Sequence, residues 1–437
     1  MYIKGAFEMP LEYCIWGCGN RGKNIDRFMG GKGVRAFIDQ NPALQGTTYQ
    51  GRPVIGFDEF LRDYSQCAVI VSPLLHQRDI QRILEQKHIR CLSSLFLPPE
   101  VAEVPVPDLY RLIDQKLREG GVYLYGLNLF SILLLEHYRA EGLRPVQIVP
   151  EEGAERWLVE AVEDSYPDGI AALEEAENLY LTSNRCVTEE AAAKNPINIY
   201  DFLCDVDGYY NPETEKQKGI YQGKRCFILG TGPSLQYEDL DRLKENEELC
   251  ISVNEIVHAY AFTAWRPDYY VVTDKMILEL YKDTLLQSDE SGYVFVSDTA
   301  LRGMPTHEKF HRFHVSLLEV SESCPTLFSR DFARGAYAGG MVIYAAIQLA
   351  VYMGCSELYL YGVDFDYSNP QKNHFVEDTP EWVTKDIPNR LPQALRHAAI
   401  SFASARKAAE QIGVRIYNAS RRSKLDIFER VDFDSLF

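Results

Sequence analysis

Residues 225–235 read RCFILGTGPSL, and their apolar run CFIL leads directly into the turn Gly230–Ser234. This pattern predicts a buried β-strand that ends in a tight turn. Gly232 permits another group to approach the backbone closely, Pro233 suits the start of a helix, and Ser234 can cap that helix or bind a phosphate. It is not a Walker A loop, because no Gly-Lys-Ser/Thr follows. The stretch therefore predicts a phosphate-binding turn, with a purely structural turn as the alternative.

Apolar strands and helices alternate through the whole C-terminal half. After RCFIL come ELCISVN, DYYVVTD, YVFVSD, ELYLYGVD and VRIYNAS, each of which reads as a buried strand. The helical stretches between them include residues 338–354, which are apolar at nearly every turn, and the amphipathic residues 391–413. This order predicts an α/β fold whose larger domain, residues 216–437, is a doubly wound, mostly parallel sheet.

Polar side chains stand where several of these strands end, namely Asn254, Asp274, Asp364 and Asp366. Ligands of open α/β sheets bind at the carboxyl ends of the strands, so we expect these residues to share one pocket with the Gly230–Ser234 turn. Each of them could equally cap a helix or stabilise a turn. Asp364 and Asp366 could together hold Mg²⁺, unless they belong to a solvated loop.

The N-terminal region contains a second glycine-rich turn. Gly17-Cys18-Gly19-Asn20-Arg21-Gly22 fits GxGxxG between a predicted strand and a predicted helix, and Asp39 ends the next strand. An acidic side chain at this place can bind a ribose hydroxyl. Gly17, Gly19, Gly22 and Asp39 thus form a second candidate nucleotide-type site, in a Rossmann-like module. The alternative is an empty scaffold, and NAD-dependent redox chemistry is disfavoured because no hydride-transfer partner follows.

Residues 122–153 repeat the strand, turn, helix and strand rhythm of the first module, but GLNLFS replaces GCGNRG. We interpret them as a weak internal repeat, a degenerate Rossmann-like module without its nucleotide turn. A proline-rich segment near residues 97–108 and a polar segment at 205–219 punctuate the chain. The predicted domains are residues 1–108, 109–215 and 216–437.

Histidines are candidate general bases, because their ordinary pKa lies near neutrality. His374 follows the Asp364 loop and His397 lies on a predicted helix, although either could be structural. Three others have the i, i+4, i+7 spacing of a metal-binding helix face, but their stretch reads as a strand, on which they would not converge: His307, His311 and His314.

The bulk composition restricts the partners. A net charge of −18 disfavours non-specific binding to nucleic acid or to anionic membranes, although a local pocket can still be cationic. No signal peptide opens the chain and no apolar run approaches the roughly 20 residues of a membrane span, so a cytoplasmic location without a transmembrane segment is expected. The ten cysteines are scattered without a CxxC pair, which favours reduced thiols. Homo-oligomer formation stays open.

The C-terminal half resembles a known superfamily. GKRCFILGTGPSL, ISVNE, PDYYVVTD, GGMVIYAAIQLAVYMGCSELYLYGVDF and VRIYNASRRSKLDIFERVDF, in this order, are similar to the MptE-like 6-hydroxymethylpterin diphosphokinases. More distantly they resemble bacterial sialyltransferases that use CMP-sialic acid, and motility accessory factors linked to flagellin glycosylation. YCIWGCGNRGKNIDRF near the N-terminus is similar to Rossmann-like modules attached to surface-polysaccharide enzymes.

The sialyltransferase resemblance implies roles for single residues. The CMP-binding GNGPS turn of that family corresponds to Gly230–Ser234, with Thr231 in place of the asparagine. Asn254 matches the next strand-end asparagine and Asp274 replaces the following one. Asp366 replaces a tyrosine that supports the leaving phosphate. The candidate nucleotide-binding residues are Gly230, Thr231, Gly232, Pro233, Ser234, Asn254, Asp274, Gly339 and Gly340. The candidate catalytic residues are His397, which matches the family's base, His374 and Asp364.

Three functions fit these residues. The leading one is a nucleotide-dependent glycosyltransferase that moves a CMP-nonulosonate-like sugar to a glycan, lipid-linked or protein acceptor. Donor phosphates would lie on the Gly230–Ser234 turn, and His397 or His374 would deprotonate the acceptor. The second is an ATP-dependent pyrophosphokinase of the 6-hydroxymethylpterin type, with Mg²⁺ on Asp364 and Asp366. The third is a non-catalytic nucleotide-sugar-binding scaffold.

Overall fold

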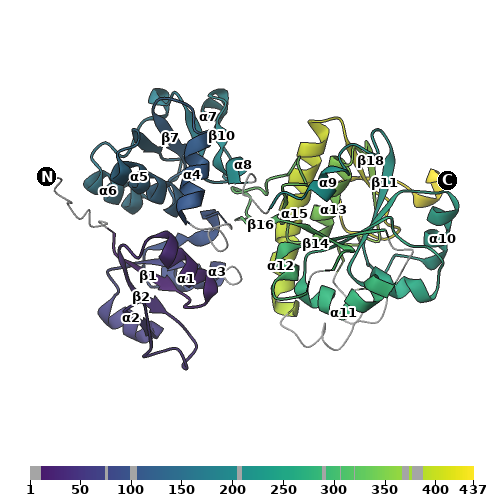
Figure 1. Cartoon of the computed structure of the whole chain (residues 1–437), viewed down its shortest axis with the longest axis horizontal. Coiled ribbons are helices and arrows are strands. Elements are labelled where there is room, and N and C mark those ends of the chain that lie inside the picture. Colours follow the sequence, from purple (N-terminus) through teal and green to yellow (C-terminus); the bar gives the residue numbers. More distant parts are fainter. Residues whose placement is uncertain are drawn as a thin grey trace. The chain divides into compact units, whose positions relative to one another are not determined.

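Largely parallel β-sheets flanked by helices make up the computed structural model, which confirms the predicted α/β class (Figure 1). The structure describes residues 11–73, 77–98, 106–203, 209–287, 292–305, 307–318, 320–366, 374–375 and 387–437. The chain divides into two units, Met1–Val206 and Asp207–Phe437. The sequence-based domain boundaries at residues 108 and 215 stay predictions.

The first sheet of unit 1 is built around β1 (Tyr13–Trp16) and has the strand order β3-β4-β2-β1-β5-β6. All four residues of β1 are buried, as expected for a parallel strand that is covered on both faces. The GxGxxG turn leads from β1 into α1 (Asn20–Phe28), as the sequence predicts. The other elements are β2 (Val34–Ile38), β3 (Thr48–Tyr49), β4 (Arg52–Ile55), α2 (Phe57–Asp63), β5 (Ala68–Val71), α3 (Gln77–Gln86), β6 (Cys91–Ser93) and η1 (Ser94–Phe96).

The second sheet of unit 1 has the order β10-β9-β7-β8, the same arrangement as β6-β5-β1-β2. Like β1, its strand β7 (Val122–Tyr125) leads through a short turn into a helix, α5 (Leu129–Glu141). The internal repeat inferred from the sequence therefore extends to the strand order of the two sheets. The remaining elements are α4 (Val106–Lys116), β8 (Val146–Val149), α6 (Arg156–Ser165), η3 (Leu173–Glu175), β9 (Leu179–Leu181), α7 (Glu189–Ala193), β10 (Ile197–Asn198) and α8 (Ile199–Leu203).

Unit 2 is organised by a parallel sheet with the order β15-β14-β13-β12-β11-β18-β19-β20. The strand RCFIL is β11 (Arg225–Leu229), and it pairs with β12 on one side and β18 on the other. The chain moves outward from β11 to β15 and then returns to β18, so the sheet is doubly wound, as predicted. The other strands are β12 (Cys250–Val253), β13 (Tyr269–Val272), β14 (Tyr293–Ser297), β15 (Phe310–Phe313), β18 (Glu357–Tyr361), β19 (Arg415–Asn418) and β20 (Glu429–Arg430).

Helices cover this sheet, and a small second ladder joins β16 (Val315–Ser316) to β17 (Ala336–Tyr337). The apolar stretch predicted as a buried helix is α13 (Val342–Tyr352), and all but two of its residues are buried. The amphipathic stretch is part of α15 (Ile387–Glu410). The remaining elements are α9 (Pro212–Glu215), α10 (Tyr237–Glu245), η4 (Asn254–Ala261), α11 (Lys275–Gln287), α12 (Asp298–Leu301) and η5 (Phe433–Leu436).

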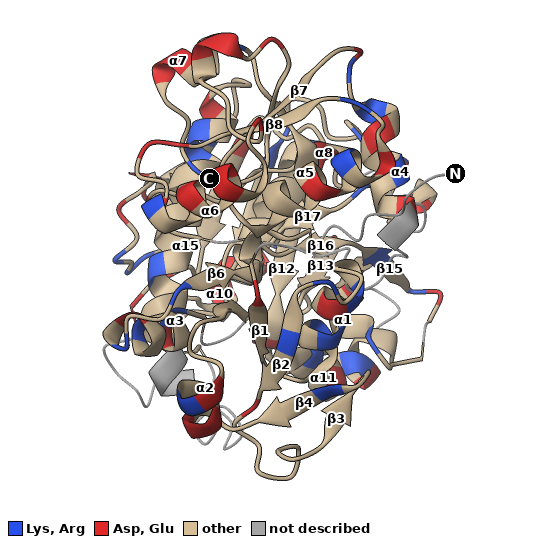
Figure 2. Cartoon of the chain, turned by 90° about the vertical axis from the view of Figure 1, so that its left-hand side faces the viewer, with Lys and Arg blue, Asp and Glu red and all other residues tan. Residues whose placement is uncertain are grey.

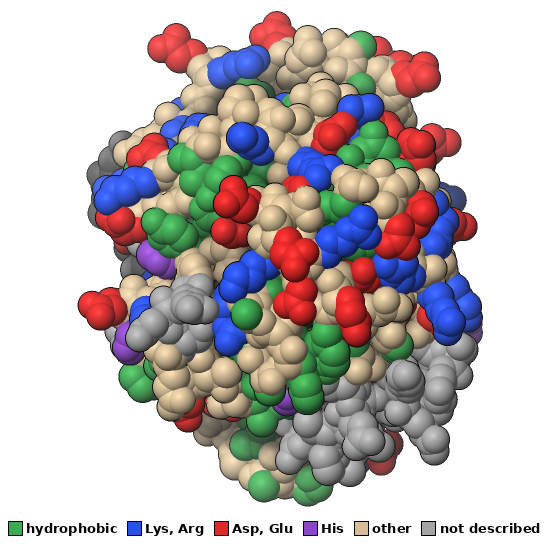
Figure 3. All heavy atoms as spheres, turned by 90° about the vertical axis from the view of Figure 1, so that its right-hand side faces the viewer, with side chains coloured by type: hydrophobic (Ala, Val, Ile, Leu, Met, Phe, Trp, Pro, Cys, Tyr) green, Lys and Arg blue, Asp and Glu red, His purple; other side chains and the backbone are tan. Residues whose placement is uncertain are grey.

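The surface of each unit mixes charges of both signs. Basic and acidic residues are interspersed along the helices of unit 1 in the ribbon of Figure 2. On the face of unit 2 in Figure 3, basic and acidic side chains lie side by side with small apolar areas. Although the net charge of the protein is −18, basic residues are therefore present on the surface of both units. Within the described residues, no helix combines the length and apolar character needed to cross a membrane.

Candidate functional site

The two central strands of unit 2 form a topological switch point, the place where ligands of open α/β sheets bind. The Gly230–Ser234 turn follows β11, and the Gly362–Asp366 loop follows the neighbouring β18. The amide of Gly230 donates to the Tyr361 carbonyl at 2.8 Å, and the amide of Gly232 donates to the Gly362 carbonyl at 2.8 Å. The turn predicted from the sequence is thus tied directly to the loop beside it.

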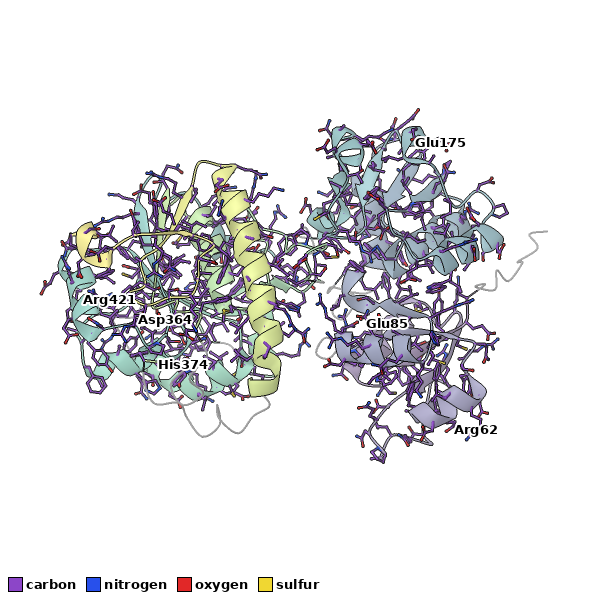
Figure 4. The ribbon with its side chains drawn as sticks, turned by 180° about the vertical axis from the view of Figure 1, so that it is seen from behind. Arg62, Glu85, Glu175, Asp364, His374 and Arg421 are labelled. Atoms are coloured by element: carbon purple, nitrogen blue, oxygen red, sulfur yellow. The ribbon has the colours of Figure 1, made fainter. Side chains whose placement is uncertain are left out.

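Asp364, which is labelled in Figure 4, holds the turn through both of its carboxylate oxygens. Oδ2 accepts the Ser234 amide at 2.7 Å, and Oδ1 accepts the Ser234 hydroxyl. Burial raises the pKa of Asp364, and the Ser234 hydrogen bonds offset part of that rise. Each carboxylate oxygen therefore accepts one hydrogen bond from Ser234, which gives Asp364 a structural role in holding the turn.

The glycines of the turn are required by this contact. A Cβ on Gly230 would lie 2.5 Å from the Gly362 carbonyl oxygen. A Cβ on Gly232 would lie 2.7 Å from both that oxygen and the Asp364 Cγ. The sequence correctly predicts a close approach at Gly232, but the approaching groups are the backbone and carboxylate of the Gly362–Asp366 loop. A larger residue at Gly232 is therefore expected to disturb the fold as well as any bound ligand.

A buried acid, a hydroxyl and a histidine meet beside the turn. Thr231 Oγ1 donates to Glu255 Oε2 at 3.5 Å, and His374 Nε2 lies 3.8 Å from the same oxygen. The exposed fractions of Thr231, Glu255 and His374 are 7%, 4% and 7%. The amide of Phe375 donates to the Thr231 carbonyl at 2.9 Å, which holds His374 in place. Of the predicted catalytic residues, His374 and Asp364 thus lie beside the predicted turn.

Glu255 was missed by the sequence reasoning. Its signal is ISVNE, in which an acidic residue directly follows the strand-end Asn254. Asn254 has a φ of 48°, and Phe365, in the loop after β18, has a φ of 53°. Asparagine tolerates this left-handed region, whereas a bulky aromatic residue rarely adopts it. Backbone strain of this kind is concentrated at functional sites, and here both residues flank the Gly230–Ser234 turn.

Three aromatic rings lie next to the same turn. Tyr237, at the start of α10, stacks on Phe262 with centroids 4.9 Å apart and meets Phe375 edge-on at 6.0 Å. Phe262 is 66% exposed, although aromatic side chains of this size are usually buried. The cluster of Tyr237, Phe262 and Phe375 therefore offers an apolar aromatic surface beside the polar Thr231 and Glu255, with the ring of Phe262 exposed.

Other predicted residues have local structural roles in the structure. Asp274 is exposed and caps α11, because its Oδ1 accepts the amide of Met276 at 2.7 Å. Asp366 pairs with Lys424, with Nζ 2.8 Å from Oδ1. In the described part of the chain, no group of three or more His, Cys, Asp or Glu side chains is placed to hold a metal ion. Mg²⁺ at Asp364 and Asp366 stays a prediction that these contacts do not favour.

Gly339 and Gly340 lie just before α13, and Gly340 contacts the helix that carries His397. A Cβ on Gly340 would lie 3.0 Å from the His397 Cβ, and one on Gly339 would lie 2.3 Å from the Tyr344 ring. The structure thus brings Gly340 and His397 together.

In the predicted nucleotide-type site of unit 1, the acidic residue Asp39 is hydrogen-bonded to the glycine-rich turn itself. Asp39 Oδ2 accepts the Cys18 amide at 2.8 Å and Oδ1 accepts the Asn41 amide at 2.9 Å. A Cβ on Gly22 would lie 1.9 Å from the Gly17 carbonyl oxygen, so this glycine serves close packing within the turn. Gly19 has open space, with no atom within 4 Å of an added Cβ. A nucleotide here stays a prediction, and the contacts favour the scaffold alternative.

The degenerate module has the same contact, in which an acidic side chain accepts a backbone amide of the turn, and we call this contact a clamp. Glu151, after β8, accepts the amide of Leu127 at 2.6 Å and pairs with Arg185. Leu127 is the second residue of its turn, as Cys18 and Thr231 are of theirs. All three turns therefore place an acidic residue, from the end of the next strand, against their second residue. In unit 2 the acid meets the Thr231 side chain, and within the described residues the Thr231 amide donates to no acceptor.

Residues 201–370 match the family model of 6-hydroxymethylpterin diphosphokinase MptE-like proteins. This match confirms the resemblance seen in the C-terminal half, and it indicates a transferase. The structure of MAf glycosyltransferase from Magnetospirillum magneticum AMB-1 is similar at 15% identity and a TM-score of 0.33. That similarity covers 76% of this chain and 62% of the other, so the chain spans less than two thirds of that protein's length. No curated protein matches the sequence.

Proposed function

We propose that the chain is a nucleotide-dependent transferase whose donor binds beside the Gly230–Ser234 turn. The observation that carries the proposal is the Thr231 amide. Thr231 is 7% exposed, and an N–H group of a buried residue that has no protein acceptor is a place where a bound group can supply one. The equivalent amides of Cys18 and Leu127 are occupied by acids, whereas that of Thr231 is left for a donor phosphate or ribose.

The surrounding side chains suit the parts of a nucleotide. Glu255 can accept hydrogen bonds from ribose hydroxyls, as acids at the end of the second strand do in nucleotide-binding folds. The cluster of Tyr237, Phe262 and Phe375 can stack on a base. Positive charge for the phosphates would come from Arg422, whose charge offsets part of the rise that burial causes in the pKa of the neighbouring Asp364. Its basic neighbours are engaged, because Lys424 is paired with Asp366 and Arg421 with two other acids. His374 is placed to receive a proton from an acceptor hydroxyl at this site.

Within this class we favour a glycosyltransferase that uses a nucleotide-activated sugar, CMP-nonulosonate-like, with a glycan, lipid-linked or protein acceptor. Its catalysis would rest on positioning and on hydrogen-bond donors that stabilise the leaving phosphate. The Asp364 and Asp366 contacts support this choice over one that depends on a metal held by these two residues. We also propose that the protein works in the cytoplasm, where nucleotide-activated sugars are the donors.

The family match at residues 201–370 specifically favours a second candidate, pyrophosphoryl transfer from ATP to a pterin-like alcohol. The two chemistries release different nucleotides: pyrophosphoryl transfer releases AMP from ATP, and glycosyl transfer releases CMP from the CMP-sugar. Turnover of ATP with 6-hydroxymethylpterin and of CMP-sugars, followed by chromatography of the nucleotides, separates them. Absence of both products with retained nucleotide binding would leave the scaffold.

Nucleotide binding itself is tested by calorimetry with CMP, UDP, GDP and ATP. Glu255→Gln should weaken the affinity for the nucleotide about tenfold, because the charge of one hydrogen bond, worth about 1.5 kcal/mol, is lost. Phe262→Ala should weaken it about 5- to 150-fold, since base stacking contributes about 1–3 kcal/mol. Asp39→Asn, at the equivalent acid of unit 1, is the matched control and should change nothing. Loss of affinity in the control alone would overturn the assignment of the site.

A further inference from the structure

A second cluster of reactive side chains lies elsewhere on the carboxyl edge of the unit 2 sheet. Asp298 directly follows β14, His314 directly follows β15, and Ser316 is the last residue of β16. The His314 Nδ1 lies 2.5 Å from Asp298 Oδ2, and its Nε2 lies 3.2 Å from the Ser316 hydroxyl. The proposed donor site uses none of these residues.

The contacts of His314 orient its ring so that it can act as a general base toward Ser316. Because a carboxylate holds the proton on Nδ1, a neutral His314 presents the Nε2 lone pair to the serine hydroxyl. The ring of Tyr209 stacks on the imidazole, with centroids 3.7 Å apart and planes 5° from parallel. Asp298 is itself held, since its Oδ1 accepts the amides of Thr299 at 2.8 Å and of Val315 at 3.2 Å.

The three residues of the cluster are also almost fully shielded from solvent. The exposed fractions of Asp298, His314 and Ser316 are 8%, 4% and 8%. In such surroundings a hydroxyl, its base and a carboxylate that orients the base form the arrangement that activates serine nucleophiles. Convergence on this geometry occurs in unrelated folds, so it is identified by distances and roles and not by sequence position.

Hydrogen-bond donors for a developing oxyanion stand nearby. Ser316 is in register with Tyr337 of β17, and the Ala338 amide donates to the Ser316 carbonyl at 2.9 Å. Gly339 and Gly340 follow directly and lead into α13, and among the described residues their amides donate to no acceptor. Backbone amides of this kind are the usual components of an oxyanion hole.

We propose that Ser316, His314 and Asp298 form an acyl-transfer centre that accepts small acyl groups from esters. Ser316 Oγ attacks the ester carbonyl carbon while its proton passes to His314 Nε2. The bond from that carbon to the alcohol oxygen breaks, and the alcohol takes the proton. Water then attacks the acyl-serine by the same path and releases the carboxylic acid. Asp298 is a positioning residue, and the low exposure of Ser316 restricts the acyl group to a size near that of acetate.

The test uses the full-length protein with two small probes, p-nitrophenyl acetate and a short-chain alkyl fluorophosphonate. The fluorophosphonate should add to Ser316 with loss of fluoride, and peptide mass spectrometry should locate the adduct there. Acetate release from p-nitrophenyl acetate should fall to background in Ser316→Ala. In His314→Gln it should fall about 10²- to 10⁴-fold, the contribution typical of a general base. In Asp298→Asn it should fall too, and Asp298→Glu should recover part of it.

Ser329→Ala is the matched control. Ser329 lies close in sequence and is half-buried, but its hydroxyl donates to the Gly335 carbonyl at 2.6 Å instead of facing a histidine. It should take no label, and its substitution should leave the Ser316 adduct unchanged. If neither probe modifies Ser316 in the folded parent protein, or if His314→Gln is labelled at the parent's rate, the proposal is wrong. Both results come from the parent protein and from His314→Gln, so they do not depend on whether Ser316→Ala folds.

Discussion

The second glycines of the two GxG turns should respond in opposite ways to the same substitution. Gly19 and Gly232 occupy the same position in their sequences, each after a buried strand and before a helix. An added Cβ meets nothing within 4 Å at Gly19, but at Gly232 it meets the Gly362 carbonyl oxygen and the Asp364 Cγ at 2.7 Å. Gly19→Ala should therefore be tolerated, whereas Gly232→Ala should destabilise unit 2.

The distances set the magnitude. Overpacking by one carbon costs about 1–3 kcal/mol where the neighbours are held in place. At Gly232 one neighbour is backbone, and moving the other, Asp364, would break its bond from the Ser234 amide, worth about 1.5–3 kcal/mol. The sum is a loss of about 2.5–6 kcal/mol for unit 2. Gly19→Ala should stay within about 1 kcal/mol of the parent, because a lower entropy of the unfolded chain offsets the poorer helix cap.

Native-state hydrogen exchange on the full chain measures both units at once. The amides of β11 and β18 report the opening of unit 2, and those of β1 report that of unit 1. Gly232→Ala should speed exchange in β11 and β18 and leave β1 unchanged, while Gly19→Ala should leave both unchanged. Equal effects of the two substitutions on their own strands would refute the argument from packing. A nucleotide-binding defect in Gly232→Ala would carry meaning only after this correction for stability.

Three further outcomes follow from named contacts. The pKa of Asp364 is raised in the folded protein, so its contribution to stability is complete below its ordinary value of 3.8 and is lost as the pH rises through the higher folded value. In urea titrations, the stability of the parent relative to Asp364→Asn should therefore increase as the pH falls from 7 to 4; a constant difference would contradict this. Asp274→Ala should cost about 1 kcal/mol, the value of a helix cap, without changing the nucleotide affinity seen by calorimetry. Glu151→Gln removes the charge of a buried carboxylate that pairs with the partly exposed Arg185 and should destabilise unit 1 by about 1–3 kcal/mol, visible as faster exchange in β7. A change confined to unit 2 would show that this contact is not what holds the turn.

The sequence predicts the elements of the fold well because their signals are local. Apolar runs bounded by glycine, proline and serine mark β11 and its turn within a dozen residues, and the alternation of such runs marks a parallel sheet. Even the degenerate turn after β7 is recognisable, because the strand before it and the helix after it keep their patterns. The resemblance to the MptE-like superfamily needed only the order of these same segments.

The candidate site is harder, because its contacts join residues that are far apart in the chain. Gly232 is next to Asp364 only because the chain returns from β15 to the strand beside β11, so no local pattern could show which group would approach the glycine. Glu255 is an ordinary acidic residue in the sequence and becomes a site residue only when Thr231 lies against it. In the sequence, His314 stands out only by its spacing to two other histidines, which is typical of a metal-binding helix face. In the structure it contacts Asp298 and Ser316.

The three clamped turns give a physical reason why one chain can carry similar modules with different roles. An acid that captures the second amide of a turn supplies the charge and the acceptor that a phosphate or ribose would otherwise bring, so the fold is complete without a ligand. Asp39 and Glu151 do this in unit 1. In unit 2, Asp364 takes over the fastening of the turn, and Glu255 meets a hydroxyl instead of the amide. Moving the clamp from the second residue to the fifth leaves the Thr231 amide open while the turn stays rigid, which is the condition a preorganised binding site requires.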